Sequence, residues 1–120
     1  MSQERRLLGQ AGGALAADVL KQQGYKILTR NYRTPYGEID LIARQGDTLV
    51  FIEVKLRRSE VFGPPQAAVN TAKQRHLKLA AQYYLNQQHA EDIKVRFDVV
   101  AITLAGQLPR IEIFAGAIED

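Results

Sequence analysis

Two carboxylates and a lysine stand close together in the stretch GEIDLIARQGDTLVFIEVK, residues 37–55. Apolar and polar residues alternate on either side of Gly46-Asp47, a pair that suits a two-residue hairpin turn. With this turn Asp40 becomes the cross-strand neighbour of Glu53, their Cβ atoms about 4.5–5.5 Å apart. Because like charges so placed repel, the pattern predicts something that neutralises them: a raised pKa, a basic neighbour or a divalent cation.

Lys55 follows Glu53 by two residues, so it lies on the same face of the predicted strand, about 6.6 Å further along. Carboxylates on adjacent strands suit a hard cation such as Mg²⁺, and an ammonium group beside them can reach a water or a phosphate oxygen. Glu38, opposite Lys55 in this register, is either an outer acid of the site or the ion-pair partner of Lys55. The alternative is that these charges form the solvated face of an edge hairpin, where they protect against aggregation.

The opposite face of this hairpin is wholly apolar. A slip of one residue would expose that face to water, so the pattern itself supports the register. The face is expected to cover the core with six residues: Ile39, Leu41, Ala43, Val50, Ile52 and Val54.

Elements around the hairpin are predicted from periodicity and turn residues. Apolar residues at helical spacing indicate a helix over 3–23 that ends at Gly24, and YKILTRNYRT indicates a strand before a turn at 35–37. RRSEVFGPPQ, with two prolines, reads as a loop, and Thr71 with Gln74 resembles a capping box that opens a helix to about residue 88. Strands over 93–103 and 110–116 complete the order α-β-β-β-α-β-β, which indicates an α/β or α+β sheet with helices packed on it.

Composition bounds the class of protein. A chain of 120 residues forms one domain. No apolar run approaches the roughly 20 residues that span a bilayer, and the N-terminus reads as an amphipathic helix rather than a signal peptide. The absence of cysteine excludes disulfides and thiolate metal sites, so a cytoplasmic location without membrane association is expected. The net charge of +3 permits a polyanionic partner without requiring one.

An acid, some dozen residues and then Glu-x-Lys, within this order of elements, resembles the PD-(D/E)XK nuclease superfamily. The longer stretches GYKILTRNYRTPYGEIDLIARQGDTLVFIEVKLRRSEVFG and RFDVVAI resemble the small bacterial YraN-like family, which is similar to archaeal Holliday-junction resolvases. The resemblance implies a single nuclease-like domain over residues 1–120: a restriction-endonuclease-like αβββαβ core whose central mixed sheet is flanked by helices. It also implies a role in DNA repair or recombination and a homodimer, because resolvases cut two symmetric strands.

Carried over to this chain, the resemblance makes Asp40 and Glu53 ligands of Mg²⁺ or Mn²⁺, with the Val54 carbonyl as a third. Lys55 would orient or activate the attacking water, and Glu38 and Gln74 would stand outside the ligand set. Basic residues near the predicted site are candidates for phosphate contact, with a solvated rim as the alternative. They are Arg30, Arg33, Arg57 and Arg58 near strand ends and Lys73, with Arg75 and Lys78, on the second helix.

One position departs from the family pattern. Related chains carry an acid in a Gly-Glu-x-x-Ala stretch of the first helix, whereas this chain has Gly13 there. Asp18 lies about 140° around the helix, which is too far to substitute. The predicted function is therefore a metal-dependent endonuclease that acts on branched or single-stranded DNA. Its rival is a module that binds nucleic acid or another partner and kept the fold but lost the chemistry.

Other polar and aromatic residues are assigned structural roles. Arg96 and Asp98 share one face of an apolar strand, so a mutually paired set is expected, because a buried charge needs a partner. Tyr83 and Tyr84 are expected to pack the second helix. His76 and His89 lack the spacing of a metal site.

Overall fold

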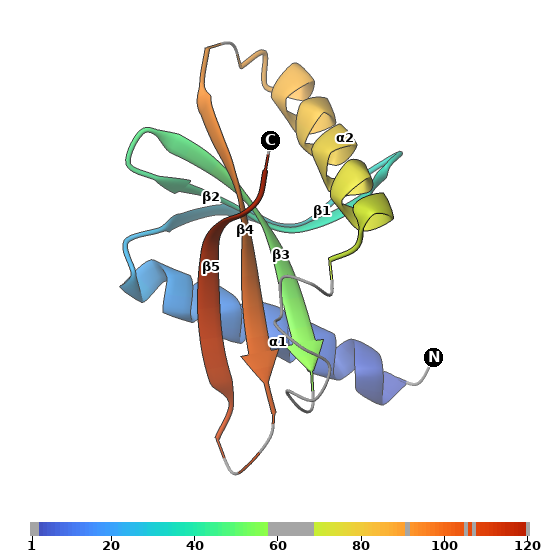
Figure 1. Ribbon diagram of the computed structural model, residues 1–120, viewed down its shortest axis with the longest axis vertical. Helices are drawn as coiled ribbons and strands as arrows, with labels where there is room; N and C mark the ends of the chain where they lie inside the picture. The colour runs from blue at the N-terminus through green and yellow to red at the C-terminus, as the bar shows by residue number, and fades with distance from the viewer. Residues whose placement is uncertain (1–2, 58–68, 91, 105, 107, 120) are drawn as a thin grey trace.

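Seven elements follow the predicted order (Figure 1). The computed structural model describes residues 3–57, 69–90, 92–104, 106 and 108–119. The predicted proline-containing loop falls almost wholly outside these ranges. The elements are α1 (Gln3–Gln22), β1 (Lys26–Thr34), β2 (Gly37–Gln45), β3 (Thr48–Arg57), α2 (Thr71–Gln87), β4 (Lys94–Thr103) and β5 (Arg110–Ile118). The α/β class and the αβββαβ core are confirmed.

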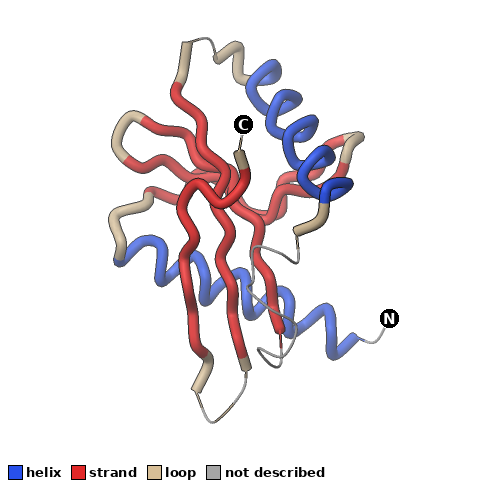
Figure 2. The backbone as a smooth tube through the Cα atoms, viewed as in Figure 1, coloured by secondary structure: helices blue, strands red, loops and turns tan. Residues whose placement is uncertain are grey.

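A single mixed sheet of five strands runs through the molecule in the order β1-β2-β3-β4-β5 (Figure 2). Strands β1, β2 and β3 form antiparallel neighbours, as do β4 and β5, whereas β3 and β4 are parallel. A parallel pair needs a crossover connection, and the segment that contains α2 supplies it. This topology places β3, which carries Glu53 and Lys55, at the centre of the sheet.

Each face of the sheet is covered by one helix, so the protein has two hydrophobic clusters (Figure 1). Ala16, Ala17 and Leu20 of α1 pack on one face and meet Leu41, Val50 and Ile52. Leu77, Ala80 and Ala81 of α2 pack on the other face, over Ile42, Phe51, Phe97 and Val99. Tyr84 adds edge-on ring contacts to Tyr32 and Phe51, which confirms its predicted packing role.

The expectation of one continuous apolar face on the β2–β3 hairpin is wrong at Ile39. Leu41, Ala43, Val50, Ile52 and Val54 lie on the α1 side as predicted, but Ile39 belongs to the cluster beneath α2. Pairing of β2 with β3 extends only as far as Leu41 and Ile52, while β2 continues along β1 to Gly37. Because β2 leaves β3 at this point, alternation along the hairpin no longer fixes the side that Ile39 takes.

The ends of the helices are set by local chemistry. Gly24 has φ +91° after α1, a conformation that glycine adopts without steric cost, which confirms the predicted end of that helix. The predicted cap of α2 is wrong by one residue. Asn70 rather than Thr71 is the N-cap, because its side chain accepts a hydrogen bond from the backbone N–H of Lys73 at 2.9 Å.

Arg96 and Asp98 form the paired structural set that the sequence predicts. Asp98 is fully buried, and its Oδ1 accepts from Arg96 Nε at 2.8 Å and from the Gly116 N–H at 2.9 Å. The Tyr25 hydroxyl donates to Asp98 Oδ2 at 2.8 Å, and burial, followed by that hydrogen bond, raises the pKa of Tyr25 to about 12. Arg96 Nη2 also donates to Gln45 Oε1 at 2.6 Å. The network joins the start of β1, the end of β2, β4 and β5.

A candidate metal and nucleic-acid site

The candidate site lies where β2 and β3 separate. Beyond the last ladder pair, Leu41 with Ile52, the Asp40 carboxylate replaces a backbone partner for β3: the Val54 N–H donates to Asp40 Oδ2 at 2.8 Å. This bond holds Asp40 against β3 at the point where the two strands part. The separation therefore creates a place for a charged side chain between two interior strands of the sheet.

Two details of the predicted hairpin are corrected by this geometry. Asp40 and Glu53 interact electrostatically but lie beyond the paired part of the ladder, so they are not ladder partners. Glu38 is opposite Arg33 of β1, not opposite Lys55, because β2 stays with β1 to its end. The alternative of a solvated edge hairpin is also wrong, since β2 and β3 are interior strands and Glu53 is 9% exposed.

Lys73 reaches the site from the first turn of α2. Its Nζ donates to Glu53 Oε1 at 2.8 Å, with the Glu53 side chain 11% exposed and that of Lys73 47% exposed. Sequence analysis gives Lys73 as a candidate for phosphate contact, with a solvated helix face as the alternative. The structure instead directs its ammonium group at the carboxylate cluster, where it acts as the basic neighbour that the carboxylates require.

The pKa of Asp40 is raised, as expected of a buried acid beside other acids. Burial is the largest cause, the Glu53 carboxylate adds to it, and together they raise the pKa of Asp40 to about 7. The hydrogen bond from Val54 and the charge of Lys73 act in the opposite sense without cancelling the shift. A raised pKa and a basic neighbour thus both relieve the repulsion that the sequence predicts.

The two lysines of the cluster differ in their electrostatics. Burial lowers the pKa of Lys55, and a hydrogen bond with Lys73 and its charge lower it further. For Lys73 burial acts to lower the pKa, but the hydrogen bond to Glu53 leads the effects that raise it overall. The pKa values of the two lysines are therefore shifted in opposite directions, that of Lys73 upward and that of Lys55 downward.

Asp40 and Glu53 can bind one hard cation, but they supply only part of its ligands. Oδ2 of Asp40 accepts from Val54 and Oε1 of Glu53 accepts from Lys73, while Oδ1 of Asp40 and Oε2 of Glu53 make no hydrogen bond to the described residues. Mg²⁺ is commonly bound by one or two carboxylates, with waters and substrate phosphates completing its coordination. Over the described ranges, no group of three or more His, Asp or Glu side chains is placed to hold a metal. These residues therefore fit a shared, water-rich site and not a closed protein cage.

The remaining predicted residues are distributed around the cluster. Gln74 Nε2 donates to the Val69 carbonyl at 2.8 Å, so its amide braces the start of α2. Arg57 Nε donates to Thr103 Oγ1 at 3.2 Å, which ties it to the end of β4. Arg30 reaches towards α1: its Nη2 would lie 3.3 Å from a Cβ atom added at Gly13. Arg58 lies outside the described residues.

A groove along α2 was not anticipated from the sequence. It has a volume of about 730 Å³ and lies between the β1–β2 turn and the outer side of the first turns of α2. Tyr36, 46% exposed, and Leu79, 39% exposed, supply much of its apolar surface. Pro35, Thr71, Ala72, Arg75 and His76 complete the lining. The only sequence signal for it is an aromatic residue within a predicted turn, PYG.

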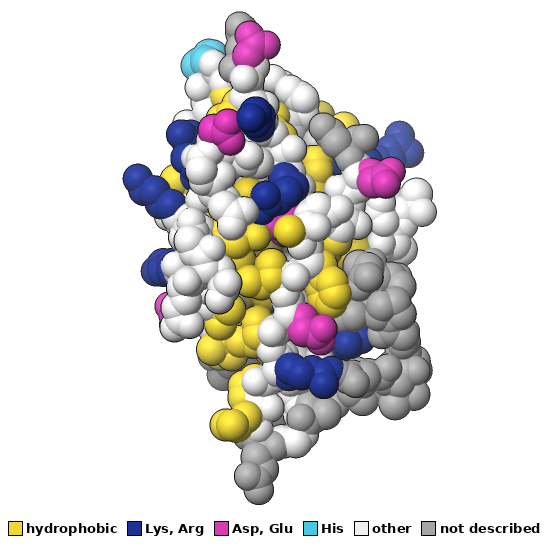
Figure 3. All heavy atoms as spheres, turned by 60° about the vertical axis from the view of Figure 1, so that its left-hand side comes forward, with side chains coloured by type: hydrophobic (Ala, Val, Ile, Leu, Met, Phe, Trp, Pro, Cys, Tyr) yellow, Lys and Arg dark blue, Asp and Glu magenta, His cyan; other side chains and the backbone are white. Residues whose placement is uncertain are grey.

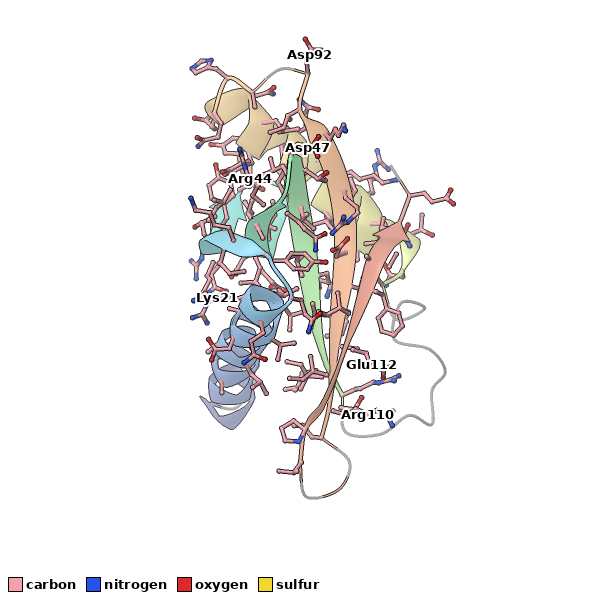
Figure 4. All side chains as sticks on the ribbon, turned by 90° about the vertical axis from the view of Figure 1, so that its left-hand side faces the viewer. Lys21, Arg44, Asp47, Asp92, Arg110 and Glu112 are labelled. Carbon is pink, nitrogen blue, oxygen red and sulfur yellow. The ribbon has the colours of Figure 1, made fainter. Side chains whose placement is uncertain are left out.

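Charges elsewhere on the surface are mixed. In Figure 3, the described Lys and Arg side chains are interspersed with Asp and Glu, and hydrophobic side chains occupy the middle of that face. Asp47, at the β2–β3 turn, pairs with Lys94 at 2.9 Å, and Arg110 lies 3.5 Å from Glu112 near the β4–β5 connection (Figure 4). These pairs reduce the local charge, so this face offers no extended basic stripe among the described residues.

Comparison with known proteins gives a family without an assigned chemistry. The model of the family described as "Uncharacterised protein family UPF0102" matches residues 12–102. The chain belongs to this family. A UPF0102 protein of Geobacter metallireducens is 48% identical over 119 residues, which cover 99% of this chain and 98% of the relative. One from Thermodesulfovibrio yellowstonii is 53% identical over 95 residues, 79% of this chain and 84% of the relative.

Membership confirms the predicted YraN-like family. The names of these relatives state no activity, metal or partner, so the resemblance to nucleases stays a prediction. Neither described helix combines the length and apolar character needed to cross a membrane.

Proposed function

We propose that this protein is a metal-dependent endonuclease that hydrolyses phosphodiester bonds in branched or single-stranded DNA. The observation that carries the proposal is the cluster at the β2–β3 separation: Asp40 and Glu53 together, with Lys55 two residues along β3. Burying two interacting acids costs stability, because burial and mutual repulsion both disfavour their charged forms. A site that tolerates this cost is a strong candidate for chemistry.

Within this mechanism, Asp40 and Glu53 would hold Mg²⁺ or Mn²⁺. A cation bound there would supply Lewis-acid stabilisation of the phosphoryl oxygens. Lys55, whose pKa burial and then Lys73 lower, would orient or activate the attacking water. The Val54 N–H fixes the Asp40 carboxylate, and so orients the oxygen that is left for a ligand.

The groove beside α2 supplies a place for the strand next to the scissile phosphate. Tyr36 offers an exposed ring on which an unpaired base can stack, while Arg75 can contact a phosphate. Its lining contains no acidic residue among the described side chains, so it complements a polyanion. A DNA partner is consistent with the predicted cytoplasmic location.

The test is cleavage of branched and single-stranded DNA by purified protein in Mg²⁺ or Mn²⁺. Asp40→Asn, Glu53→Gln and Lys55→Met should each lower the rate at least 100-fold, since such residues act as a unit. Arg44→Ala, an exposed substitution at the hairpin end, is the control and should cleave normally. Cleavage that survives both carboxylate substitutions would disprove the assignment.

A second function is favoured by Gly13. The position that carries an acid in related chains lies next to the Arg30 guanidinium, so positive charge occupies that part of the molecule. The alternative is a module that binds DNA through this fold without cutting it. It predicts salt-sensitive DNA binding that is unchanged by Asp40→Asn, together with no Mn²⁺ binding by calorimetry.

A further inference from the structure

The carboxylate cluster already contains a cation, and the cation belongs to the protein. Lys73 Nζ lies 2.8 Å from Glu53 Oε1, and its charge also acts on Asp40. A lysine ammonium and a divalent cation are attracted by the same two carboxylates and repel each other, so binding of one weakens binding of the other. Either one relieves the repulsion between the two acids.

The placement of Lys73 makes it a cation that can leave. It is the third residue after the Asn70 cap, and its side chain is 47% exposed although it contacts a carboxylate that is 11% exposed. A four-carbon chain anchored at a helix start can rotate its ammonium group into water at small cost. Lys55, by contrast, lies within β3 and is held in register with Ala101 of β4.

We propose that Lys73 is a resident counter-ion of the Asp40–Glu53 site, which a divalent cation displaces when it binds. The inference rests on the proposed function, because it requires these two carboxylates to be the metal site. The displaced ammonium group would remain on the first turn of α2 and would turn into water, which already reaches 47% of the Lys73 side chain.

The first test measures Mn²⁺ affinity by calorimetry for the wild type, Lys73→Met and Lys78→Met. Methionine keeps an unbranched side chain and removes the charge. Lys78 lies five positions further along α2, so its variant has the same net charge and controls for long-range attraction. Lys73→Met should bind Mn²⁺ about five- to tenfold more tightly than Lys78→Met, since a partly exposed ion pair no longer has to be broken.

The second test follows the ammonium group itself in the unsubstituted protein. Lysines are methylated reductively with and without Mn²⁺, and modification at each position is quantified by mass spectrometry. Displacement predicts a several-fold increase at Lys73 and no change at Lys78. A purely structural ion pair would leave the reactivity of Lys73 unaltered, and this measurement does not depend on the folding of any variant.

The outcomes separate this inference from the proposed function. Mn²⁺ binding that is equal in both variants, with unchanged modification of Lys73, would overturn the counter-ion inference and leave the metal site intact. If only Lys73→Met bound Mn²⁺, the inference would be supported, and Lys73 would compete for the carboxylates more strongly than Mn²⁺ does. Binding by none of the three proteins would overturn both the inference and the metal dependence of the proposed function.

Discussion

At the scale of single residues, Asp40 has the most informative environment in the protein. The fold raises the pKa of this acid to about 7. One hydrogen bond, from the Val54 N–H, holds its carboxylate at the point where β2 and β3 separate. Asp98 is buried completely yet satisfied by three partners, Tyr25, Arg96 and Gly116. The contrast indicates that Asp98 is an integral part of the structure, whereas Asp40 retains a carboxylate oxygen for a ligand.

Stability should therefore depend on pH through Asp40. The pKa is 3.8 in an unperturbed chain and about 7 in the fold, so the folded state binds more protons than the unfolded state between these values. Stability then falls as pH rises across that window. We expect Asp40→Asn to be more stable than the wild type at pH 8, on the order of 1–3 kcal/mol, and the difference to vanish near pH 4.

Urea unfolding at several pH values measures this effect. Asp47→Asn is the control with the opposite sign, because a hydrogen bond from Lys94, together with its charge, lowers the pKa of Asp47. Any stability that this exposed pair contributes is present at neutral pH and lost as pH falls through the lowered pKa. Parallel profiles for Asp40→Asn and the wild type would show that Asp40 does not titrate abnormally.

At the scale of elements, alternation and turn residues predicted the strands and helices because they are local properties. Leu41, Ala43, Val50 and Ile52 lie on one face as expected, and the β2–β3 register is correct throughout its paired length. Two features were beyond such reasoning. The first is the point at which β2 leaves β3, because period-two alternation fixes only the side of the sheet on which a side chain lies. The second is the Lys73–Glu53 contact, because it joins residues 20 positions apart on different elements.

The start of α2 illustrates the same limit, since Asn70 and Thr71 are both good caps and only geometry selects one. Asn70→Ala removes the acceptor for the Lys73 N–H and should cost about 1 kcal/mol, whereas Thr71→Ala should cost much less. Urea midpoints of the two variants compare them directly. A larger loss for Thr71→Ala would contradict the cap assignment. Because Lys73 donates to this cap, fraying at Asn70→Ala should also weaken the placement of its ammonium group.

At the scale of the whole molecule, the proposed function depends on which surface would face the nucleic acid. A net charge of +3 is too small to direct DNA by itself, and exposed pairs such as Lys94 with Asp47 reduce it locally. Helix α2 is common to the site and the groove, because Lys73 contacts Glu53 while Thr71, Ala72 and Arg75 line the groove with the β1–β2 turn. We therefore infer that a single strand approaches along the β1–β2 turn and α2.

Binding of a single-stranded oligonucleotide in the presence of EDTA tests this orientation without cleavage. Tyr36→Ala should weaken binding by about 1–3 kcal/mol through lost stacking, and Tyr36→Phe should retain most of it, because the ring rather than the hydroxyl makes the contact. Arg75→Ala should lower the slope of log K against log salt by about 0.7, the value for one phosphate contact on a single strand. Arg110→Ala, near the β4–β5 connection (Figure 4), should leave the slope unchanged. If Arg75→Ala and Arg110→Ala lowered the salt slope equally, the DNA would lie on another surface. DNA that binds in the groove should be sensitive only to substitutions of residues that line it.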